Sequence, residues 1–347
     1  MDREDQLIKR VSLRFPFAGD GLRVGIGDDA AILRPRVGSE WVVTTDAFLE
    51  NVHFLRNIQH PRSVGYKALA RATSDIAAMG ARPRYFFMTL GLPEACAGTW
   101  FDGFLGGLAR AARRFGLVLA GGDTTKYPLV TISLTVMGEV DRGQAILRSG
   151  ARPGDLLCVS GRLGEAELGL RLIQEKLHKQ KSWAKLLKKH FYPEPRLALG
   201  VWLAGHRAAT SKIAASTYAT STYATSTIAT SMIDTSDGLS TDLGHICEAS
   251  GVGAIVWARE IPLARVPVGL TRRGFDPLDM ALHGGEDYEL LFTVSKKFSS
   301  RLPARVGGVP ITVIGEMTRA KKVILLGTDG RTTPLQAKGW DPFRKKS

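Results

Sequence analysis

Four short acidic segments, most of them rich in glycine, constrain the fold of this chain more than any other feature. They are residues 25–29 (Gly-Ile-Gly-Asp-Asp), 44–46 (Thr-Thr-Asp), 121–125 (Gly-Gly-Asp-Thr-Thr) and 234–238 (Asp-Thr-Ser-Asp-Gly). Several follow an apolar run of the kind that forms a buried strand. Glycine permits sharp turns and close approach of a ligand, and aspartate oxygens suit Mg²⁺. The pattern predicts strands that end in acidic loops and a magnesium site able to hold polyphosphate.

Strand-like and helix-like segments alternate along the chain in two successive halves. In the first half, hydrophobic periodicity predicts strands at 42–46, 85–91, 117–120 and 129–137, and helices at 63–79 and 100–115. In the second half it predicts strands at 156–160, 232–233 and 288–294, and helices at 165–176 and after Gly238. This alternation predicts an α/β or α+β fold.

The turn-rich segment at residues 148–155 marks the best candidate for a domain boundary. A chain of 347 residues is long for a single core and suits two domains. We therefore predict an N-terminal domain at 1–147 and a C-terminal α/β domain at 148–347.

Residues 208–231 form a low-complexity segment of mainly Ala, Ser, Thr, Tyr and Ile. The tripeptide Ala-Thr-Ser at 209–211 recurs at 229–231. We interpret the segment as an expansion that was inserted before a strand, and we expect it to form a mobile surface loop.

The net charge of +14 raises nucleic acid as a partner. Much of the excess lies in the lysine-rich residues 176–189, which we interpret as an amphipathic helix with a solvated basic side. No aromatic stacking motif or zinc-finger spacing accompanies it, so we favour a solvated basic surface over a nucleic-acid-binding site.

The chain has no sequence signal for export or for a membrane span. No apolar run approaches the roughly 20 residues that cross a bilayer, and the N-terminus has no signal-peptide core. The three cysteines are far apart and form no CxxC pair. These features predict a cytoplasmic protein without a disulfide framework or a zinc site.

The segment Gly25 to Ala30 also matches the dinucleotide fingerprint GxGxxA. Two bare aspartates within it would repel a pyrophosphate, whereas an intervening Mg²⁺ would turn that repulsion into attraction. We therefore favour metal over nicotinamide. The chain contains no Walker A sequence, so any use of ATP needs another scaffold.

Four further residues have both a structural and a functional interpretation. Asp75 is a solvent-facing helix residue or, given its small neighbours, part of a closely packed site. His53 is structural or reaches the site of Asp46. Glu286 lies in a glycine-rich loop, and Trp340 is either a packing residue or a lid over a flat ligand.

The order and spacing of these motifs resemble the thiamine-monophosphate kinase family, of the aminoimidazole-ribonucleotide-synthetase-like superfamily. The resemblance runs from Gly25 to about Phe343. It rests on the acidic segments above, on residues 74–81 (Ser-Asp-Ile-Ala-Ala-Met-Gly-Ala), on residues 148–151 (Arg-Ser-Gly-Ala) and on residues 284–290 (Gly-Gly-Glu-Asp-Tyr-Glu-Leu). It implies a two-domain synthetase-like fold whose N-terminal mixed sheet packs against a second copy, as a homodimer.

The resemblance also implies a reaction and roles for particular residues. The reaction is Mg²⁺-dependent transfer of the ATP γ-phosphate to thiamine monophosphate, with several metal ions and no covalent intermediate on the enzyme. The implied magnesium ligands are Asp29, Thr44, Thr45, Asp46, Asp75, Asp123, Asp234 and Asp237. The implied ATP contacts are Gly122, Asp123, Arg148 and Ser236, and the implied thiamine-phosphate contacts are His53, Glu286 and Trp340.

Two departures and two alternatives stay open. This chain has Ala72-Thr73 where the family usually has Asn-Leu, and the low-complexity segment comes shortly before Asp234. The two alternatives are that the chain is another ATP-dependent synthetase of the same superfamily, or that it is a non-catalytic, basic nucleic-acid-binding protein.

Overall fold

The computed structural model describes residues 4–15, 21–26, 30–205, 227–340 and 343. Asp29, a predicted magnesium ligand, lies outside the described residues, and so do residues 208–226 of the low-complexity segment. Among the described residues, no helix has the length and apolar character needed to cross a membrane.

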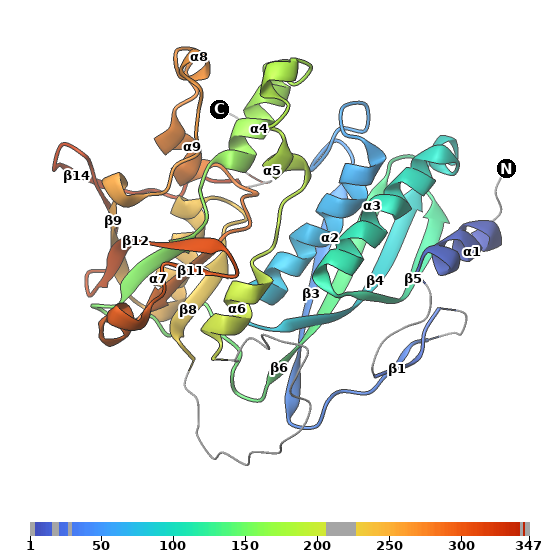
Figure 1. Cartoon of the computed structure of the whole chain (residues 1–347), viewed down its shortest axis with the longest axis horizontal. Helices are drawn as coiled ribbons and strands as arrows, with labels where there is room; N and C mark the ends of the chain where they lie inside the picture. Colours follow the sequence, from blue (N-terminus) through green and yellow to red (C-terminus); the bar gives the residue numbers. More distant parts are fainter. Residues whose placement is uncertain (1–3, 16–20, 27–29, 206–226, 341–342, 344–347) are drawn as a thin grey trace.

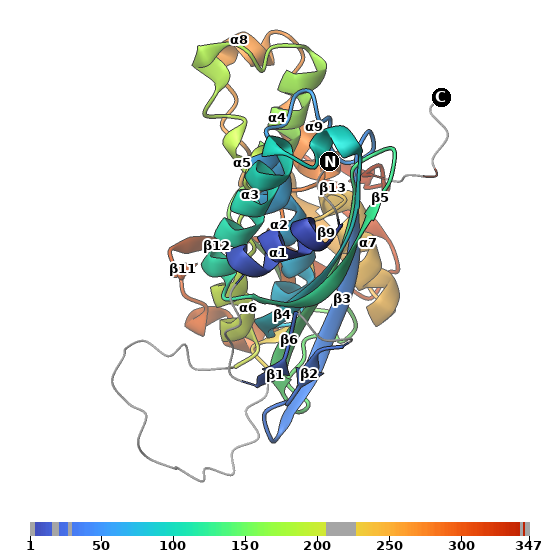
Figure 2. The ribbon, with the colours of Figure 1, turned by 90° about the vertical axis from the view of Figure 1, so that its right-hand side faces the viewer.

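The N-terminal half is built on a four-stranded mixed sheet with strand order β3-β6-β4-β5. The strands are β3 (Ser39–Leu49), β4 (Arg82–Leu92), β5 (Val118–Lys126) and β6 (Thr131–Asp141). Helices α1 (Glu4–Arg14), α2 (Pro61–Ala78) and α3 (Thr99–Phe115) cover one face of this sheet, as Figure 2 shows. The main core cluster lies between these helices and the sheet.

Helix α2 is the central helix of this half, and its sequence explains its bounds. The side chain of His60 caps its first turn by accepting a hydrogen bond from the Arg62 N–H, and Pro61 occupies the first position. The helix ends before Gly80, whose φ of +70° is a left-handed conformation that glycine adopts without strain. Most of α2 is buried, so its polar side chains face other parts of the protein rather than water.

The C-terminal half contains an eight-stranded sheet with the order β14-β13-β9-β12-β7-β10-β8, in which β11 also pairs with β12. The strands are β7 (Leu156–Ser160), β8 (Ala229–Asp234), β9 (Gly253–Trp257), β10 (Leu290–Val294), β11 (Arg305–Val306), β12 (Val309–Thr318), β13 (Val323–Leu326) and β14 (Thr332–Pro334). The helices are α4 (Glu165–Gln174), α5 (Lys188–Phe191), α6 (Leu197–Leu203), α7 (Leu239–Ser250), α8 (Val268–Thr271) and α9 (Pro277–His283).

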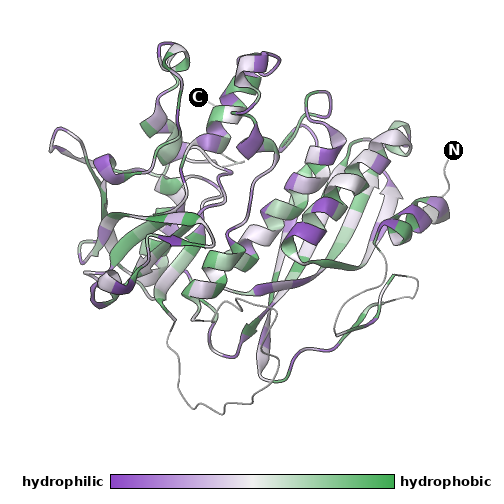
Figure 3. Cartoon of the chain, viewed as in Figure 1, coloured by the Kyte–Doolittle hydropathy of each residue, from purple (hydrophilic) through white to green (hydrophobic). Residues whose placement is uncertain are grey.

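The two halves meet along the C-terminal end of α2 (Figure 1). Ala77 and Ala78 of α2 share a core cluster with Leu199 of α6 and Met232 of β8. Gly200 permits this close approach, because a Cβ atom there would lie 2.1 Å from the Ala77 carbonyl oxygen. Hydrophobic residues line the strands and the helix sides that face them (Figure 3). The fold is therefore the predicted mixed α/β architecture, and we keep residue 148 as the proposed domain boundary.

Two of the acidic segments lie within strands, which corrects the expectation of loops at strand ends. Asp46 lies inside β3, paired with Leu134 of β6. Asp123 lies inside β5, paired with Thr89 of β4. The glycines beside Asp123 are tolerated in an edge strand, and Gly122 has a packing reason, since a Cβ there would lie 2.0 Å from the Met88 carbonyl oxygen.

The basic segment is not one amphipathic helix, contrary to our expectation. Helix α4 ends at Gln174, and Lys176 has a φ of +57°, which breaks the helical path. Two short pieces follow, the 3₁₀ turn η2 (Lys181–Trp183) and helix α5. Leu177 and Leu187 anchor this irregular stretch in a separate core cluster.

The last residues of the proposed insertion are also not a loop. Residues 229–231 begin β8, where Met232 pairs with Phe292 of β10. Ala229 and Ser231 are buried there. Residues 229–231 of the proposed insertion therefore belong to β8.

Deletion of residues 212–231 is expected to leave a folded protein. It places the Ala-Thr-Ser of 209–211 directly before Met232, which recreates the sequence of β8. It also places Ala208 where Ile228 now donates a backbone hydrogen bond to the Leu203 carbonyl, at 2.8 Å. The new spacing of five residues matches the 6→1 hydrogen bond that closes many helix C-termini.

Thermal unfolding of the deletion variant should give a midpoint within a few degrees of wild type, because loop length contributes only about 0.6 kcal/mol per doubling. Precipitation or loss of cooperative unfolding would show that the deleted residues form part of the core.

Candidate active site

A cavity of about 480 Å³ lies between the two halves of the protein. The N-terminal half contributes Asp46 from β3, His53 from the following loop, and Arg71 and Asp75 from α2. The C-terminal half contributes the following side chains and backbone: Asp234, Ser236, Asp237, Gly285, Glu286, Tyr288 and the segment from Lys338 to Trp340. The cavity thus collects residues from two of the four acidic segments, 44–46 and 234–238, and from both halves of the chain.

Three carboxylates crowd one side of this cavity. Burial raises the pKa of Asp75, the nearby charge of Asp46 raises it further, and a 2.5 Å hydrogen bond from Thr44 Oγ1 lowers it. Burial also raises the pKa of Asp234, and the charge of Asp75 adds to that rise. Carboxylates that repel one another in a buried place are stabilised by a bound cation.

A fourth carboxylate, that of Asp242, lies behind this group. Its Oδ2 accepts backbone hydrogen bonds from Asp237 at 3.2 Å and from Gly238 at 2.9 Å. Burial, together with the charges of Asp234 and Asp237, raises the pKa of Asp242 well above its usual value. Asp242 therefore holds the turn that presents Asp237.

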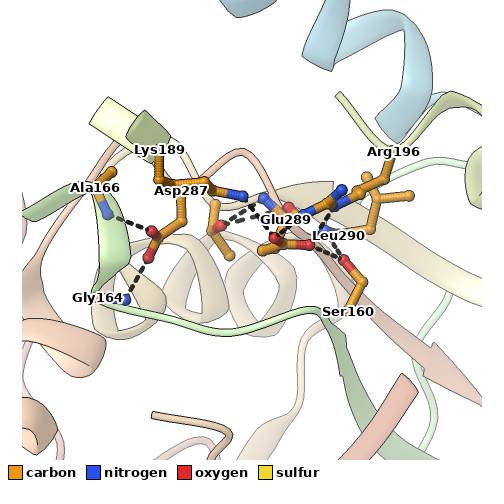
Figure 4. A network of polar contacts seen from close by, with 9 residues as sticks. Ser160, Gly164, Ala166, Lys189, Arg196, Asp287, Glu289 and Leu290 are labelled. Carbon is orange, nitrogen blue, oxygen red and sulfur yellow. Dashed lines mark hydrogen bonds and ion pairs between the residues drawn. The ribbon is translucent and has the colours of Figure 1, made fainter. Parts of the chain in front are cut away.

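The loop that presents Glu286 is strained and firmly held. Glu286 and Tyr288 have φ angles of +66° and +50°, which residues other than glycine rarely adopt. Between them, Asp287 accepts hydrogen bonds from the backbone N–H groups of Gly164 at 2.5 Å and Ala166 at 2.9 Å (Figure 4). Such strain persists only where the surroundings determine the conformation.

Glu289 anchors the other end of the loop. Its buried carboxylate accepts hydrogen bonds from Lys189 Nζ at 2.7 Å, from Ser160 Oγ at 2.6 Å and from the guanidinium of Arg196 (Figure 4). Burial opposes ionisation of Glu289, but these cations outweigh it and lower its pKa. This network fixes where β10 begins and, through it, where Glu286 points.

Glu286 meets two residues that the sequence interpretation missed. Lys67, fully buried on α2, places Nζ 2.7 Å from Glu286 Oε2, and His190 Nδ1 lies 3.5 Å from the same oxygen. Burial raises the pKa of Glu286, but Lys67 and His190 reverse this and the net pKa is lowered. A sequence signal existed, because Lys67, Arg71 and Asp75 follow at intervals of four and share one face of α2.

His53 has a defined tautomer when neutral. Its Nδ1 accepts a hydrogen bond from the Leu49 backbone N–H at 3.0 Å, so the proton is on Nε2. Burial, followed by the charge of Arg71, lowers its pKa to about 4, so the ring is neutral at pH 7. His53 therefore offers a neutral N–H donor at the wall of the cavity.

His190 gives the fold a measurable sensitivity to acid. Burial, followed by the charge of Lys67, lowers its pKa to about 3, whereas an unfolded histidine titrates near pH 6.5. Below about pH 6.5 the unfolded chain therefore binds a proton that the folded chain does not, and stability falls as pH falls. Between pH 7 and pH 5, wild type should lose about 2 kcal/mol relative to His190→Gln, measured by urea unfolding at each pH. Parallel stability profiles for the two proteins would contradict this burial effect.

The structure brings together many of the predicted site residues but not all of them. Those that line the cavity are Asp46, His53, Asp75, Asp234, Ser236, Asp237, Glu286 and Trp340. Thr44 and Arg148 line an adjoining pocket of about 400 Å³ that shares Asp75 and Asp234 with the cavity. Gly122 and Asp123 lie in a separate pocket beside α1, and Thr45 is exposed on the sheet, hydrogen-bonded to Thr135 at 2.9 Å.

The carboxylates of the cavity suit a metal ion whose remaining ligands are water and substrate phosphates. Within the described residues, no group of three or more His, Cys, Asp or Glu side chains is arranged to hold a metal ion alone. Mg²⁺ is commonly bound by one or two carboxylates together with substrate phosphates and water. Asp75 and Asp234, which repel each other, fit that pattern.

The comparisons with known proteins first define a class. Residues 27–140 match the family model "AIR synthase related protein, N-terminal domain". The chain is also 36% identical over 348 aligned residues to thiamine-monophosphate kinase of Escherichia coli strain K12, and the alignment covers 98% of each chain. The chain therefore belongs to the thiamine-monophosphate kinase family.

Solved structures agree with this assignment. The chain is similar to the crystal structure of thiamine-monophosphate kinase from Stenotrophomonas maltophilia K279a, with 36% identity, a TM-score of 0.78 and coverage of 94% of this chain and 96% of that one. It is also similar to a structure described as AaThiL complexed with AMPPCP and TMP, with 28% identity, a TM-score of 0.74 and coverage of 98% and 97%.

Proposed function

We propose that this chain transfers the γ-phosphate of ATP to the phosphate of thiamine monophosphate, giving thiamine diphosphate and ADP. One observation carries the proposal beyond family membership. A single cavity brings the crowded carboxylates Asp46, Asp75 and Asp234 together with His53, Glu286 and Trp340. The first group suits cations that bind phosphates, and the second suits a flat cationic ring with hydrogen-bonding edges.

The protein residues contribute position and charge rather than covalent chemistry. Phosphoryl transfer depends mainly on positioning and on electrostatic stabilisation. Bound Mg²⁺ supplies charge neutralisation between two anionic phosphates. Asp46, Asp75, Asp234 and Asp237 would hold such ions, and Thr44 orients Asp75 through its hydrogen bond. Arg148 and Ser236 are proposed ATP contacts, and each lines one of the two adjoining pockets that share Asp234.

The acceptor is proposed to lie between His53 of the N-terminal half and Glu286 and Trp340 of the C-terminal half. His53 donates from Nε2, and Glu286 accepts a hydrogen bond from the aminopyrimidine of thiamine. Trp340, which is 51% exposed, offers its ring face to the cationic thiazolium. Its backbone N–H donates to the Asp237 carbonyl at 3.0 Å, which links the acceptor side to the metal side.

An assay of ADP release tests the proposed function. The protein is incubated with ATP and Mg²⁺ and with thiamine monophosphate, with thiamine, or without an acceptor. ADP release should require thiamine monophosphate and should stop when EDTA removes the metal. Equal ADP release in all three reactions would reject the proposal.

Replacing Trp340 with alanine should weaken binding of thiamine monophosphate more than binding of ATP. A lost cation–π contact is worth about 0.5–2 kcal/mol, so we expect a loss of affinity of several-fold to about thirty-fold. Isothermal titration with each ligand measures the two effects separately. An equal loss for both ligands would indicate general disruption of the C-terminal segment.

We also infer that a second copy of the chain covers the open face of the N-terminal sheet. Among the described residues, helices cover only the other face, and Val43, Thr45, Ala47, Thr89 and Asp123 are exposed. Asp123 and Thr45, which lie outside the cavity, would then lie within the interface between copies. Sedimentation velocity tests this, because a single species near the chain mass of 37.6 kDa would contradict a dimer.

We further propose that the protein works in the cytoplasm. Support comes from Cys96, Cys158 and Cys247, which are all free and buried. Burial raises the pKa of Cys158 to about 12 and that of Cys247 to about 11, so these thiols stay protonated and unreactive. Detection of the protein in the exported fraction of its cells would overturn this location.

A further inference from the structure

The cavity presents a charge problem for its proposed acceptor. Its carboxylates would repel the phosphate of the acceptor, and a cationic side chain in the cavity would offset that repulsion. Among the described residues, the charged cations that line the cavity are Arg71 and Lys338. Lys338 is exposed at the rim, whereas Arg71 rises from α2 beside Asp46 and is 24% exposed.

The hydrogen bonding of Arg71 leaves most of its guanidinium available. Nε lies 3.2 Å from Asp46 Oδ1. Within the described part of the chain, no hydrogen bond involves either terminal nitrogen of Arg71, and the side chain lines the cavity. A partly buried guanidinium normally has partners for its donors. The two terminal nitrogens form a planar fork that matches the oxygens of a phosphate.

The surroundings keep Arg71 charged and in place. Burial opposes its charge, but Tyr288, Asp46 and Glu286 outweigh that effect and raise its pKa. The same guanidinium lowers the pKa of His53, which places it close to a proposed acceptor contact. Its charge is therefore present at any working pH, and the side chain lines the same cavity as His53 and Glu286, the proposed acceptor contacts.

We propose that Arg71 binds the phosphate of the acceptor through its two terminal nitrogens while Nε stays on Asp46. This assignment rests on the proposed function and names a specificity-determining residue for it. Arg71 selects an acceptor that carries a phosphate monoester over the same molecule without one. Among the described residues, Arg71 is the one cationic side chain that lines the cavity away from its rim. Its two terminal nitrogens, unpaired among those residues, are free to bind the phosphate while Nε stays on Asp46.

The test compares two ligands that differ only in the phosphate. Binding of thiamine monophosphate and of thiamine is measured by calorimetry in EDTA, so that no metal bridges the phosphate. In Arg71→Met, affinity for thiamine monophosphate should fall about 10- to 100-fold, whereas affinity for thiamine should change less than about twofold. Arg71→Lys should recover only part of the loss, because lysine supplies charge without the fork.

A matched control separates the contact from net charge. Arg62 lies on the same helix and is exposed, so Arg62→Met removes one charge without touching the cavity. This variant should bind both ligands as wild type does. An equal loss for the two ligands in Arg71→Met would overturn the assignment, and so would full recovery in Arg71→Lys.

Failure of this inference differs from failure of the proposed function. A wild-type protein that binds thiamine monophosphate no better than thiamine would reject phosphate recognition at this cavity altogether. A wild-type preference for thiamine monophosphate that survives in Arg71→Met would overturn the role of Arg71 alone.

Discussion

Replacing Asp234 with asparagine is expected to abolish phosphoryl transfer while leaving the fold as stable as wild type or more stable. Asp234 is 3% exposed, and its negative charge is opposed by burial and by Asp75. A neutral side chain of the same shape relieves that repulsion and removes an anionic ligand that a cation needs. Turnover should fall at least about 100-fold, as is typical when one charge-stabilising group is lost.

Two measurements on Asp234→Asn separate function from folding. Turnover is measured by thiamine diphosphate formation, and stability by thermal unfolding at pH 7, where we expect a gain of up to about 1 kcal/mol. Asp102→Asn is a suitable control, because Asp102 is 55% exposed and pairs with Arg10 far from the cavity. Near-normal turnover of Asp234→Asn, or a loss of turnover that follows a loss of stability, would contradict the proposed site.

Replacing Lys67 with methionine is expected to cost about 3 kcal/mol of unfolding free energy. The substitution preserves the apolar stem but leaves Glu286 without its 2.7 Å partner. Breaking a buried ion pair costs about 3–5 kcal/mol. We expect the lower end, because the Glu286 side chain is 23% exposed and keeps some contact with water.

A double substitution identifies the ion pair as the cause. Adding Glu286→Gln to Lys67→Met removes the unpaired charge and should restore part of the lost stability, measured by urea unfolding. Arg62→Met on the same helix should change stability by less than about 0.5 kcal/mol. Equal destabilisation of the single and double variants would show that packing, and not charge, holds Lys67 in place.

The sequence predicted the architecture well because hydrophobic periodicity follows local geometry. The helix expected at 63–79 is α2 (Pro61–Ala78), and the strand expected at 156–160 is β7 with the same bounds. Acidic segments were harder to place. Thr44 and Asp123 lie inside strands rather than at a turn, because β6 pairs with β3 beyond Thr44 and β4 pairs with β5 beyond Asp123. The neighbouring strands therefore decide how far each strand extends.

The candidate site was predictable where its residues lie in motifs and missed where tertiary contacts decide. Asp46, Asp75 and Asp234 come from short acidic patterns that stand out in the sequence. Lys67 and His190 do not, because their role depends on Glu286, which lies 219 residues beyond Lys67 along the chain. A lysine on a helix usually faces water, and only the packing of the two halves makes this one fully buried.

The most direct test of the central claim follows the labelled γ-phosphate of ATP. The protein is incubated with ATP labelled at the γ-phosphorus, with Mg²⁺ and with thiamine monophosphate, and the products are separated. Direct transfer predicts that the label appears in the terminal phosphate of thiamine diphosphate, in equal amount to the ADP formed. Label recovered only as inorganic phosphate, with no thiamine diphosphate, would contradict the account.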